Sequence, residues 1–271
     1  MTVDYIQLDP TGNITVLVES PVPRDLHREV AALVLAPERV GGEQAGFIEK
    51  PADHRAAARL QMMGGEFCGN ATMSLAVVLA RKEGLQQGQS REYLLEVSGA
   101  PGLVPCRVRR DGDGWTGTVR MPLPTALDEV EITTDGGPLR VPIVKMPGIA
   151  HLILPASAGL GEAELRRHVP EWNQMIGADA LGALTWDEAA ASIDPLVFVP
   201  AARSLVREHG CGSGTAAIGC WLAARLGRGV ETNILQPGGA ITVRADMTGS
   251  AITALSITGH VAIIGEGTLT V

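Results

Sequence analysis

Two cysteines of the chain lie in near-copies of one motif. The string EFCGNATMS contains Cys68, the string HGCGSGTAAIG contains Cys211, and an apolar stretch with helical character follows each. A thiol directly before a helix lies among free backbone N–H groups at the positive end of the helix dipole, where it ionises readily. An acid on one face of a carbon and a base on the other are the minimum needed to invert a stereocentre, so the pair predicts inversion chemistry.

The peptide groups beside the two thiols indicate the class of substrate. When a proton leaves the α-carbon of an amino acid, negative charge develops toward the carboxylate. The backbone N–H groups of Gly69, Asn70, Gly212 and Ser213 are suited to bind that charge, because they lie at two predicted helix starts. We therefore expect a small carboxylate-bearing substrate in a cleft that the two helix starts share.

Neither a cofactor nor a metal is expected. None of the three lysines lies in a recognisable pyridoxal phosphate motif. The four cysteines form no CxxC pair and have no histidine at zinc-finger spacing. Two of them are interpreted as core residues: Cys106 lies in an alternating, strand-like run, and Cys220 lies inside the apolar stretch that follows Cys211.

Composition excludes several classes of partner. The chain has 271 residues, of which 45% are hydrophobic, enough for one large core or two of ordinary size. Its net charge is −8 and no block of Lys and Arg occurs, so nucleic acid is not an expected partner. The apolar runs are too short to span a bilayer, and the start of the chain lacks the pattern of a signal peptide. We expect a cytoplasmic protein with free thiols; monomer and homodimer both stay open.

Landmarks besides the cysteines recur in the two halves of the chain. Residues 10–13 form a turn that enters an apolar strand, as do residues 147–150. The strings LLEVSGAPGLVPCRV and NILQPGGAITVRA each predict a strand, a Gly/Pro turn and a second strand. These landmarks keep their order at a nearly constant displacement, which indicates a duplication.

The repeated halves predict the architecture that must hold the thiols. Residues 71–82 and 215–226 form helices that are apolar nearly all round, and such a helix has to be enclosed. We expect an α/β (α+β) fold with two pseudo-symmetric halves, each a curved, mostly antiparallel sheet wrapped around a central helix. The predicted halves are residues 1–125, completed by the last strand 262–271, and residues 126–261, with the boundary in the turn-rich stretch 122–138.

The motifs resemble those of a known enzyme group. Over essentially the whole chain, the sequence is similar to the cofactor-independent, two-cysteine amino-acid racemases and epimerases that share the diaminopimelate epimerase fold. Within that superfamily, the strings PTGNITVLV, EQAGFIE, EFCGNATMS, CGSGTAAIG and QPGG most resemble the histidine racemases that supply D-histidine for staphylopine-type metallophores. The resemblance implies interconversion of L- and D-histidine without pyridoxal phosphate or metal.

The resemblance also implies roles for individual residues. Cys68 and Cys211 would be the two acid/base residues, and Glu43 and Glu208 would be the acidic residues close to the thiols. The residues that would contact substrate are Asn13, Gly69, Asn70, His151, Gly212, Ser213 and Gly214. A buried histidine with its hydrogen bonds satisfied is the alternative interpretation of His151.

Other functions stay open beside histidine racemisation. Diaminopimelate epimerases carry a Glu-Arg pair upstream of the second cysteine, where this chain has Ala202 and Arg203. The missing carboxylate disfavours diaminopimelate as substrate, because a charged group of the ligand would lack its partner. Another cofactor-independent racemase or epimerase is a further alternative. A catalytically silent small-molecule binding protein of the same fold is the non-enzyme alternative. A cysteine hydrolase or thiol oxidoreductase lacks the CxxC pair and the orienting third group.

Overall fold

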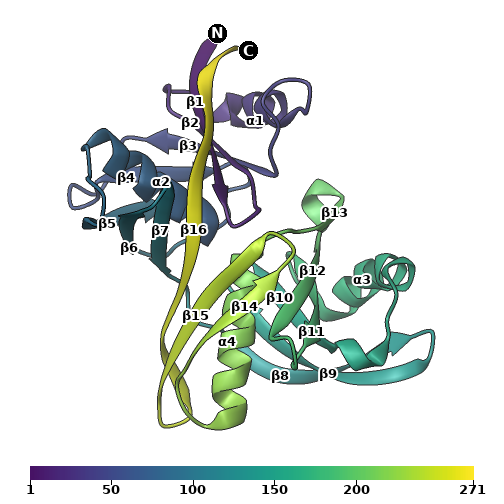
Figure 1. Cartoon of the computed structure of the whole chain (residues 1–271). Helices are drawn as coiled ribbons and strands as arrows, with labels where there is room; N and C mark the ends of the chain where they lie inside the picture. Colours follow the sequence, from purple (N-terminus) through teal and green to yellow (C-terminus); the bar gives the residue numbers. More distant parts are fainter. The chain divides into compact units, whose positions relative to one another are not determined.

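The computed structural model describes residues 1–271 and divides into two compact units. The N-terminal unit comprises Met1–Arg120 together with Ile257–Val271, and the C-terminal unit comprises Met121–Ser256. Both consist mostly of strands with a few helices, as Figure 1 shows. No helix has the length and apolar character needed to cross a membrane.

The strands of the N-terminal unit follow one another around a closed path. Their order is β1-β2-β3-β4-β5-β6-β7-β16, and β16 also pairs with β1. The pairs β2–β3 and β4–β5 are parallel, whereas β3–β4, β5–β6 and β6–β7 are antiparallel. The elements of this unit are β1 (Thr2–Pro10), β2 (Thr15–Val18), η1 (Arg24–Leu26), α1 (His27–Leu35), β3 (Gln44–Glu49), β4 (Ala58–Met62), α2 (Gly69–Lys82), β5 (Ser90–Val97), β6 (Val104–Asp111), β7 (Gly114–Arg120) and most of β16 (Ala251–Thr270).

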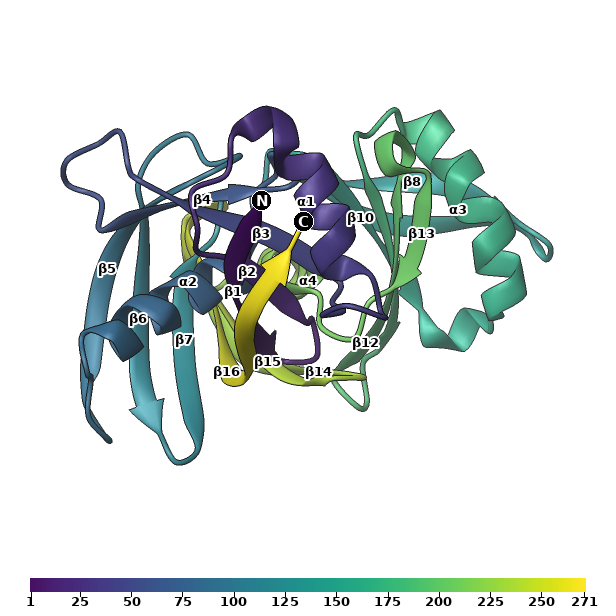
Figure 2. The ribbon, with the colours of Figure 1, turned by 90° about the horizontal axis from the view of Figure 1, so that it is seen from above.

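Helix α2 is the central helix of this unit. Its residues from Gly69 to Val78 are all buried, and so is Ala80. A helix without a polar face needs neighbours on every side, and α2 contacts β1, β2 and the strands from β4 to β7 (Figure 1). Helix α1 packs on β3 over a second apolar cluster that includes Val30, Val34 and Phe47 (Figure 2). The sheet is therefore covered on both faces.

The C-terminal unit repeats this arrangement around α4. Its strand order is β16-β15-β14-β12-β11-β10-β9-β8, with β13 paired to β12. Helix α3, which lies beside β8 in Figure 2, contacts β8, β11 and β12 and covers an apolar cluster from strands β8 to β12. The elements are β8 (Ala126–Thr134), β9 (Gly137–Met146), β10 (Ile149–Pro155), η2 (Ala156–Ala158), α3 (Glu162–Ile176), β11 (Leu181–Asp187), β12 (Ser192–Val199), η3 (Pro200–Ala202), β13 (Ser204–Arg207), α4 (Gly212–Leu226), β14 (Val230–Gln236), β15 (Gly239–Thr248) and the start of β16.

The pairing pattern matches between the units strand by strand. The pairs β10–β11 and β12–β14 are parallel and β11–β12 and β14–β15 antiparallel, as for β2–β3, β4–β5, β3–β4 and β5–β6. Strand β8 follows β7 in the chain yet pairs with β9, and β16 leaves the C-terminal unit to pair with β1. The predicted fold class, two pseudo-symmetric halves that each wrap a sheet around a helix, is confirmed.

Two local expectations need correction, and two helices are additional. Both central helices begin earlier than predicted, at Gly69 and Gly212, because the cysteine before each is itself the N-cap. The stretch interpreted as a boundary turn contains strand β8, which pairs with β9 along its whole length. The prolines and glycines that suggested a turn lie on either side of this strand. Helices α1 and α3 were not predicted; each buries an apolar face against its sheet and exposes a polar face.

Candidate active site

Cys211 caps the N-terminus of helix α4 in the C-terminal unit. Its backbone is extended, with φ −103° and ψ 101°, and its Sγ accepts a hydrogen bond from the Gly214 N–H at 3.3 Å. Thr215 donates its hydroxyl to the Cys211 carbonyl at 2.8 Å. The sulfur therefore takes the place that a serine or aspartate oxygen takes in an ordinary N-cap.

Gln236 holds the backbone of Cys211 from the end of strand β14. Its Oε1 accepts the Cys211 N–H at 2.6 Å, and its Nε2 donates to Thr215 Oγ1 at 2.7 Å. The side chain is only 8% exposed. The sequence predicted a turn here and no role for the glutamine; a polar residue at the end of a strand, just before a tight turn, was the available signal.

The electrostatics of Cys211 oppose the expectation of an easily ionised thiol. Burial raises the pKa of Cys211 well above its ordinary value, and the charge of Glu208 and its hydrogen bond with the thiol raise it further. The hydrogen bonds from Ser213 and Gly214 act in the opposite direction and are outweighed. Cys211 is only 2% exposed, and its desolvation exceeds the effect of the helix N-terminus. Cys211 therefore rests as a thiol with Glu208 as its hydrogen-bond partner.

His151 is fully buried on strand β10. Its Nε2 lies 3.0 Å from Ser213 Oγ, which in turn lies 3.5 Å from Cys211 Sγ. Its Nδ1 has no hydrogen-bond partner. Burial lowers the pKa of His151 to about 3, so the ring is neutral at physiological pH.

Cys68 occupies the matching N-cap of helix α2 in the N-terminal unit. Its φ is −131° and ψ 114°, and its Sγ accepts the Ala71 N–H at 3.4 Å. Thr72 donates its hydroxyl to the Cys68 carbonyl at 2.6 Å, as Thr215 does to Cys211. The two thiols therefore have the same local geometry, although Cys68 is the more exposed of the two.

An amide network surrounds the Cys68 thiol. The thiol donates to Gln44 Oε1 at 3.0 Å, and Gln44 Nε2 donates to Asn13 Oδ1 at 2.5 Å and to Thr15 Oγ1 at 2.8 Å. Because Nε2 has two acceptors, the amide oxygen is the atom that faces the sulfur. Asn13, predicted as a substrate contact, is 7% exposed and holds this amide. Gln44, the residue after Glu43, was not predicted as a site residue. Its string EQAGFIE contributed to the family resemblance, but the resemblance gave no role to the glutamine.

The remaining predicted residues lie beside the two thiols. Gly69, Asn70, Gly212 and Gly214 are buried in the first turns of the central helices, and Ser213 is half-buried. Glu43 is exposed, and its backbone N–H donates to the Ile14 carbonyl at 2.8 Å. The predicted residues therefore fall into two groups, one in each unit. The N-terminal group lies at the start of α2 and contains Asn13, Glu43 and Cys68; the C-terminal group lies at the start of α4 and contains His151, Glu208 and Cys211.

The other two cysteines are core residues. Cys106 and Cys220 are 0% exposed. Burial raises the pKa of both thiols, that of Cys220 to about 12.

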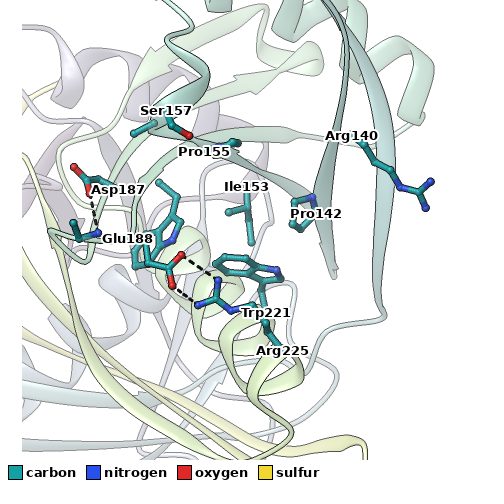
Figure 3. Close-up of a pocket in the computed structure, with 12 residues that line it drawn as sticks. Arg140, Pro142, Ile153, Pro155, Ser157, Asp187, Glu188, Trp221 and Arg225 are labelled. Carbon is teal, nitrogen blue, oxygen red and sulfur yellow. Dashed lines mark hydrogen bonds and ion pairs between the residues drawn. The ribbon is translucent and has the colours of Figure 1, made fainter.

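A separate cavity of about 560 Å³ lies in the C-terminal unit and contains none of the predicted site residues. In Figure 3, Arg225 lies over the ring of Trp221, 4.5 Å from its centroid, and forms an ion pair with Glu188. A possible metal-ligand set is also remote from the thiols. Asp135, Glu164 and His168 bring three donor atoms within 4.8 Å of one another, but Asp135 is already paired with a neighbouring arginine.

The sequence matches a family model and curated relatives that are histidine racemases. The family model described as the histidine racemase CntK N-terminal domain matches residues 2–270. A histidine racemase of Staphylococcus aureus is 28% identical over 269 residues, which cover 98% of this chain and 96% of the relative. One of Fusobacterium nucleatum subsp. nucleatum is 28% identical over 271 residues, covering 97% and 95%.

Solved structures agree on the fold. A hydroxyproline epimerase from Agrobacterium vitis superposes with a TM-score of 0.75 at 19% identity, over 99% of this chain and 92% of that chain. A phenazine biosynthesis protein of the PhzF family from Enterococcus faecalis gives 0.62 at 14% identity, over 100% of both chains. With the family model spanning almost its full length and a thiol capping each central helix, the chain belongs to the histidine racemase family.

Proposed function

We propose that the protein interconverts L- and D-histidine, with Cys68 and Cys211 as the two acid/base residues and with no bound cofactor. The matched capping geometry of the two thiols carries this proposal. Each sulfur accepts the N–H of the third residue after it, and each carbonyl accepts the hydroxyl of the fourth. Each of the two units, which share one pattern of strand pairing, thus carries a thiol at the N-cap of its central helix.

The reaction needs one thiolate and one thiol on opposite faces of the α-carbon. The thiolate takes the α-proton, and the thiol delivers its own proton to the other face, so the α-carbon inverts while one S–H bond forms and one breaks. The backbone N–H groups at the two helix starts stabilise the charge that develops on the carboxylate. After turnover the protonation states of the two cysteines are exchanged, and the reverse reaction or exchange with solvent resets them.

Glu208 accepts the proton of the Cys211 thiol. This step is needed because burial keeps Cys211 protonated. The thiol of Cys211 is hydrogen-bonded to this carboxylate and has a raised pKa, so it is a poor base by itself. Transfer of its proton to Glu208 leaves the thiolate that removes the α-proton. We assign Glu43 the corresponding role for Cys68, because Glu43 directly precedes Gln44, which contacts the Cys68 thiol.

Histidine is the proposed substrate because the family is that of histidine racemases and because Ala202 replaces the glutamate of diaminopimelate epimerases. Ala202 is exposed at the end of turn η3 and offers no charge to a second ammonium group. We also propose that the D-histidine feeds metallophore biosynthesis in the cytoplasm, where thiols stay reduced.

The deciding experiment is incubation in D₂O with L-histidine, without pyridoxal phosphate or metal, while NMR follows loss of the α-proton and chiral chromatography follows the D-isomer. Deuterated D-histidine is the expected product. Meso-diaminopimelate and L-proline serve as parallel substrates, and turnover of either one alone would replace histidine while keeping the mechanism. Absence of α-proton exchange with all three would favour a silent binding protein of this fold.

A further inference from the structure

At one equivalent position of the strand pairing, the two units carry different side chains. Strands β2 and β3 pair in parallel so that Thr15 lies beside Gln44, and β10 and β11 pair so that His151 lies beside Gly182. In the N-terminal unit the long side chain is on the second strand of the pair. In the C-terminal unit it is on the first strand, and the second strand has no side chain there.

Gly182 leaves the space that the His151 ring occupies. A Cβ atom at residue 182 would lie 2.2 Å from His151 Nδ1 and 2.7 Å from Cε1. Real Cβ contacts are never that short, so any larger residue at 182 would displace the ring. The ring is enclosed on its other sides as well, because His151 is 0% exposed.

The long side chain of each unit ends at the start of the central helix. Gln44 Oε1 lies 3.0 Å from Cys68 Sγ, and His151 Nε2 lies 3.0 Å from Ser213 Oγ, two residues after Cys211. The N-terminal unit thus places a hydrogen-bond acceptor on its thiol directly. The C-terminal unit acts on its thiol through a hydroxyl.

The tautomer of His151 decides what that hydroxyl can do. Nδ1 is buried without a partner, and a buried N–H without an acceptor is rarer than a buried acceptor without a donor. The proton of the neutral ring is therefore on Nε2, which donates to Ser213 Oγ. Because Ser213 Oγ already accepts this bond, its own hydrogen is available to donate to Cys211 Sγ, 3.5 Å away.

We propose that His151 and Gly182 are positioning residues of the C-terminal group, which orient the Ser213 hydroxyl as a donor to the Cys211 sulfur. The inference deepens the proposed function, on which it rests for the use of Cys211 as an acid/base. His151 then acts through Ser213 and not by contact with substrate. The donor stabilises the thiolate form, against the opposing effect of Glu208.

The test measures the alkylation rate of Cys211 by iodoacetamide without substrate, at a fixed, mildly alkaline pH. Mass spectrometry of the peptides gives the Cys68 rate in the same sample as an internal reference. Because the thiolate is the reactive form, His151→Phe and Ser213→Ala should each slow Cys211 by roughly two- to tenfold, while Cys68 is unchanged. His151→Gln, whose amide nitrogen can replace Nε2 as a donor, should restore most of the rate.

The double variant His151→Phe/Ser213→Ala separates an oriented hydroxyl from two independent effects. It should be no slower than Ser213→Ala alone, since both changes remove one interaction. Gly182→Ala, which displaces the ring, should match His151→Phe. Multiplying effects in the double variant, or an unchanged Cys211 rate in Ser213→Ala, would overturn the proposal, and these outcomes can be read even if histidine is not the substrate.

Steady-state kinetics give a second, independent readout. Loss of an oriented thiol partner should lower kcat and leave KM for the turned-over amino acid within about twofold. A selective rise in KM in His151→Gln would instead indicate direct substrate contact and would contradict positioning through Ser213.

Discussion

Gln236 Oε1 accepts the backbone N–H of Cys211 at 2.6 Å, while the other end of the same amide donates to Thr215. One side chain from strand β14 thus binds both the N-cap residue of α4 and the threonine that closes its first turn. Gln236 fixes the peptide group from which the reactive thiol extends.

Gln236→Leu should destabilise the protein and slow it. The variant leaves the buried N–H of Cys211 without its acceptor, and it removes the donor to the Thr215 hydroxyl, which keeps its own bond to the Cys211 carbonyl. These losses should lower the free energy of unfolding by about 1–3 kcal/mol. Urea unfolding measures this loss, and racemisation of the folded fraction should also slow. Gln174→Leu, at an exposed position of α3, is the matched control and should change stability by no more than about 0.5 kcal/mol.

Replacing either reactive thiol should remove racemisation. Cys68→Ser and Cys211→Ser should each lower kcat by about 10²–10⁴-fold, because a serine hydroxyl is a far weaker acid at the same place. Cys220→Ala, a core thiol on the same helix as Cys211, is the control: it should lower stability and leave the kcat of folded protein unchanged. Equal losses in all three variants would mean that the effect is structural.

Glu208→Gln should make the Cys211 thiol more acidic and yet slow racemisation. Removing the carboxylate removes two of the causes that raise the pKa of Cys211, so that pKa should fall and alkylation of Cys211 should accelerate. Racemisation should nevertheless slow by about 10²–10⁴-fold, because the thiol loses the group that accepts its proton. Full turnover in this variant would exclude Glu208 from proton transfer.

His151 should make the protein sensitive to acid. Its pKa falls from 6.5 to about 3 on burial, so the unfolded chain binds a proton that the folded chain does not. The stabilisation by neutral His151 is therefore complete above pH 6.5 and is lost as the pH falls toward 3, by at most about 1.4 kcal/mol per pH unit. Urea unfolding at several pH values across this range should show that the free energy of unfolding depends less steeply on pH in His151→Gln than in the unmodified protein. Equal dependence on pH in both proteins would mean that the ring is already accessible to protons.

The sequence predicted the parts of the site that depend on local pattern. A cysteine followed by Gly-Asn or Gly-Ser-Gly and then an apolar run identifies an N-cap thiol, and the repeated landmarks indicate two matching halves. The residues around the thiols were harder to predict. Gln44 and Gln236 reach Cys68 and Cys211 from strands 24 and 25 residues away along the chain, so their roles depend on strand register and on where the turns return.

The protonation state of Cys211 could not be predicted from the motif. A helix N-terminus and burial act on a thiol in opposite directions, and the local string contains only the first of these influences. Burial of Cys211 to 2% exposure follows from packing by residues distant in sequence. The same holds for His151, whose buried position depends on a missing side chain at residue 182 of the neighbouring strand.

The passage of β16 through both units has a consequence for synthesis in the cell. Strand β16 closes the N-terminal unit by pairing with β1, so that unit is incomplete until residues 257–271 have left the ribosome. The nascent N-terminal strands, with the edge of β1 unpaired, must wait for the entire C-terminal unit to be translated. Folding of the two units is therefore coupled in time, because the N-terminal unit closes only after the chain has been translated through β16.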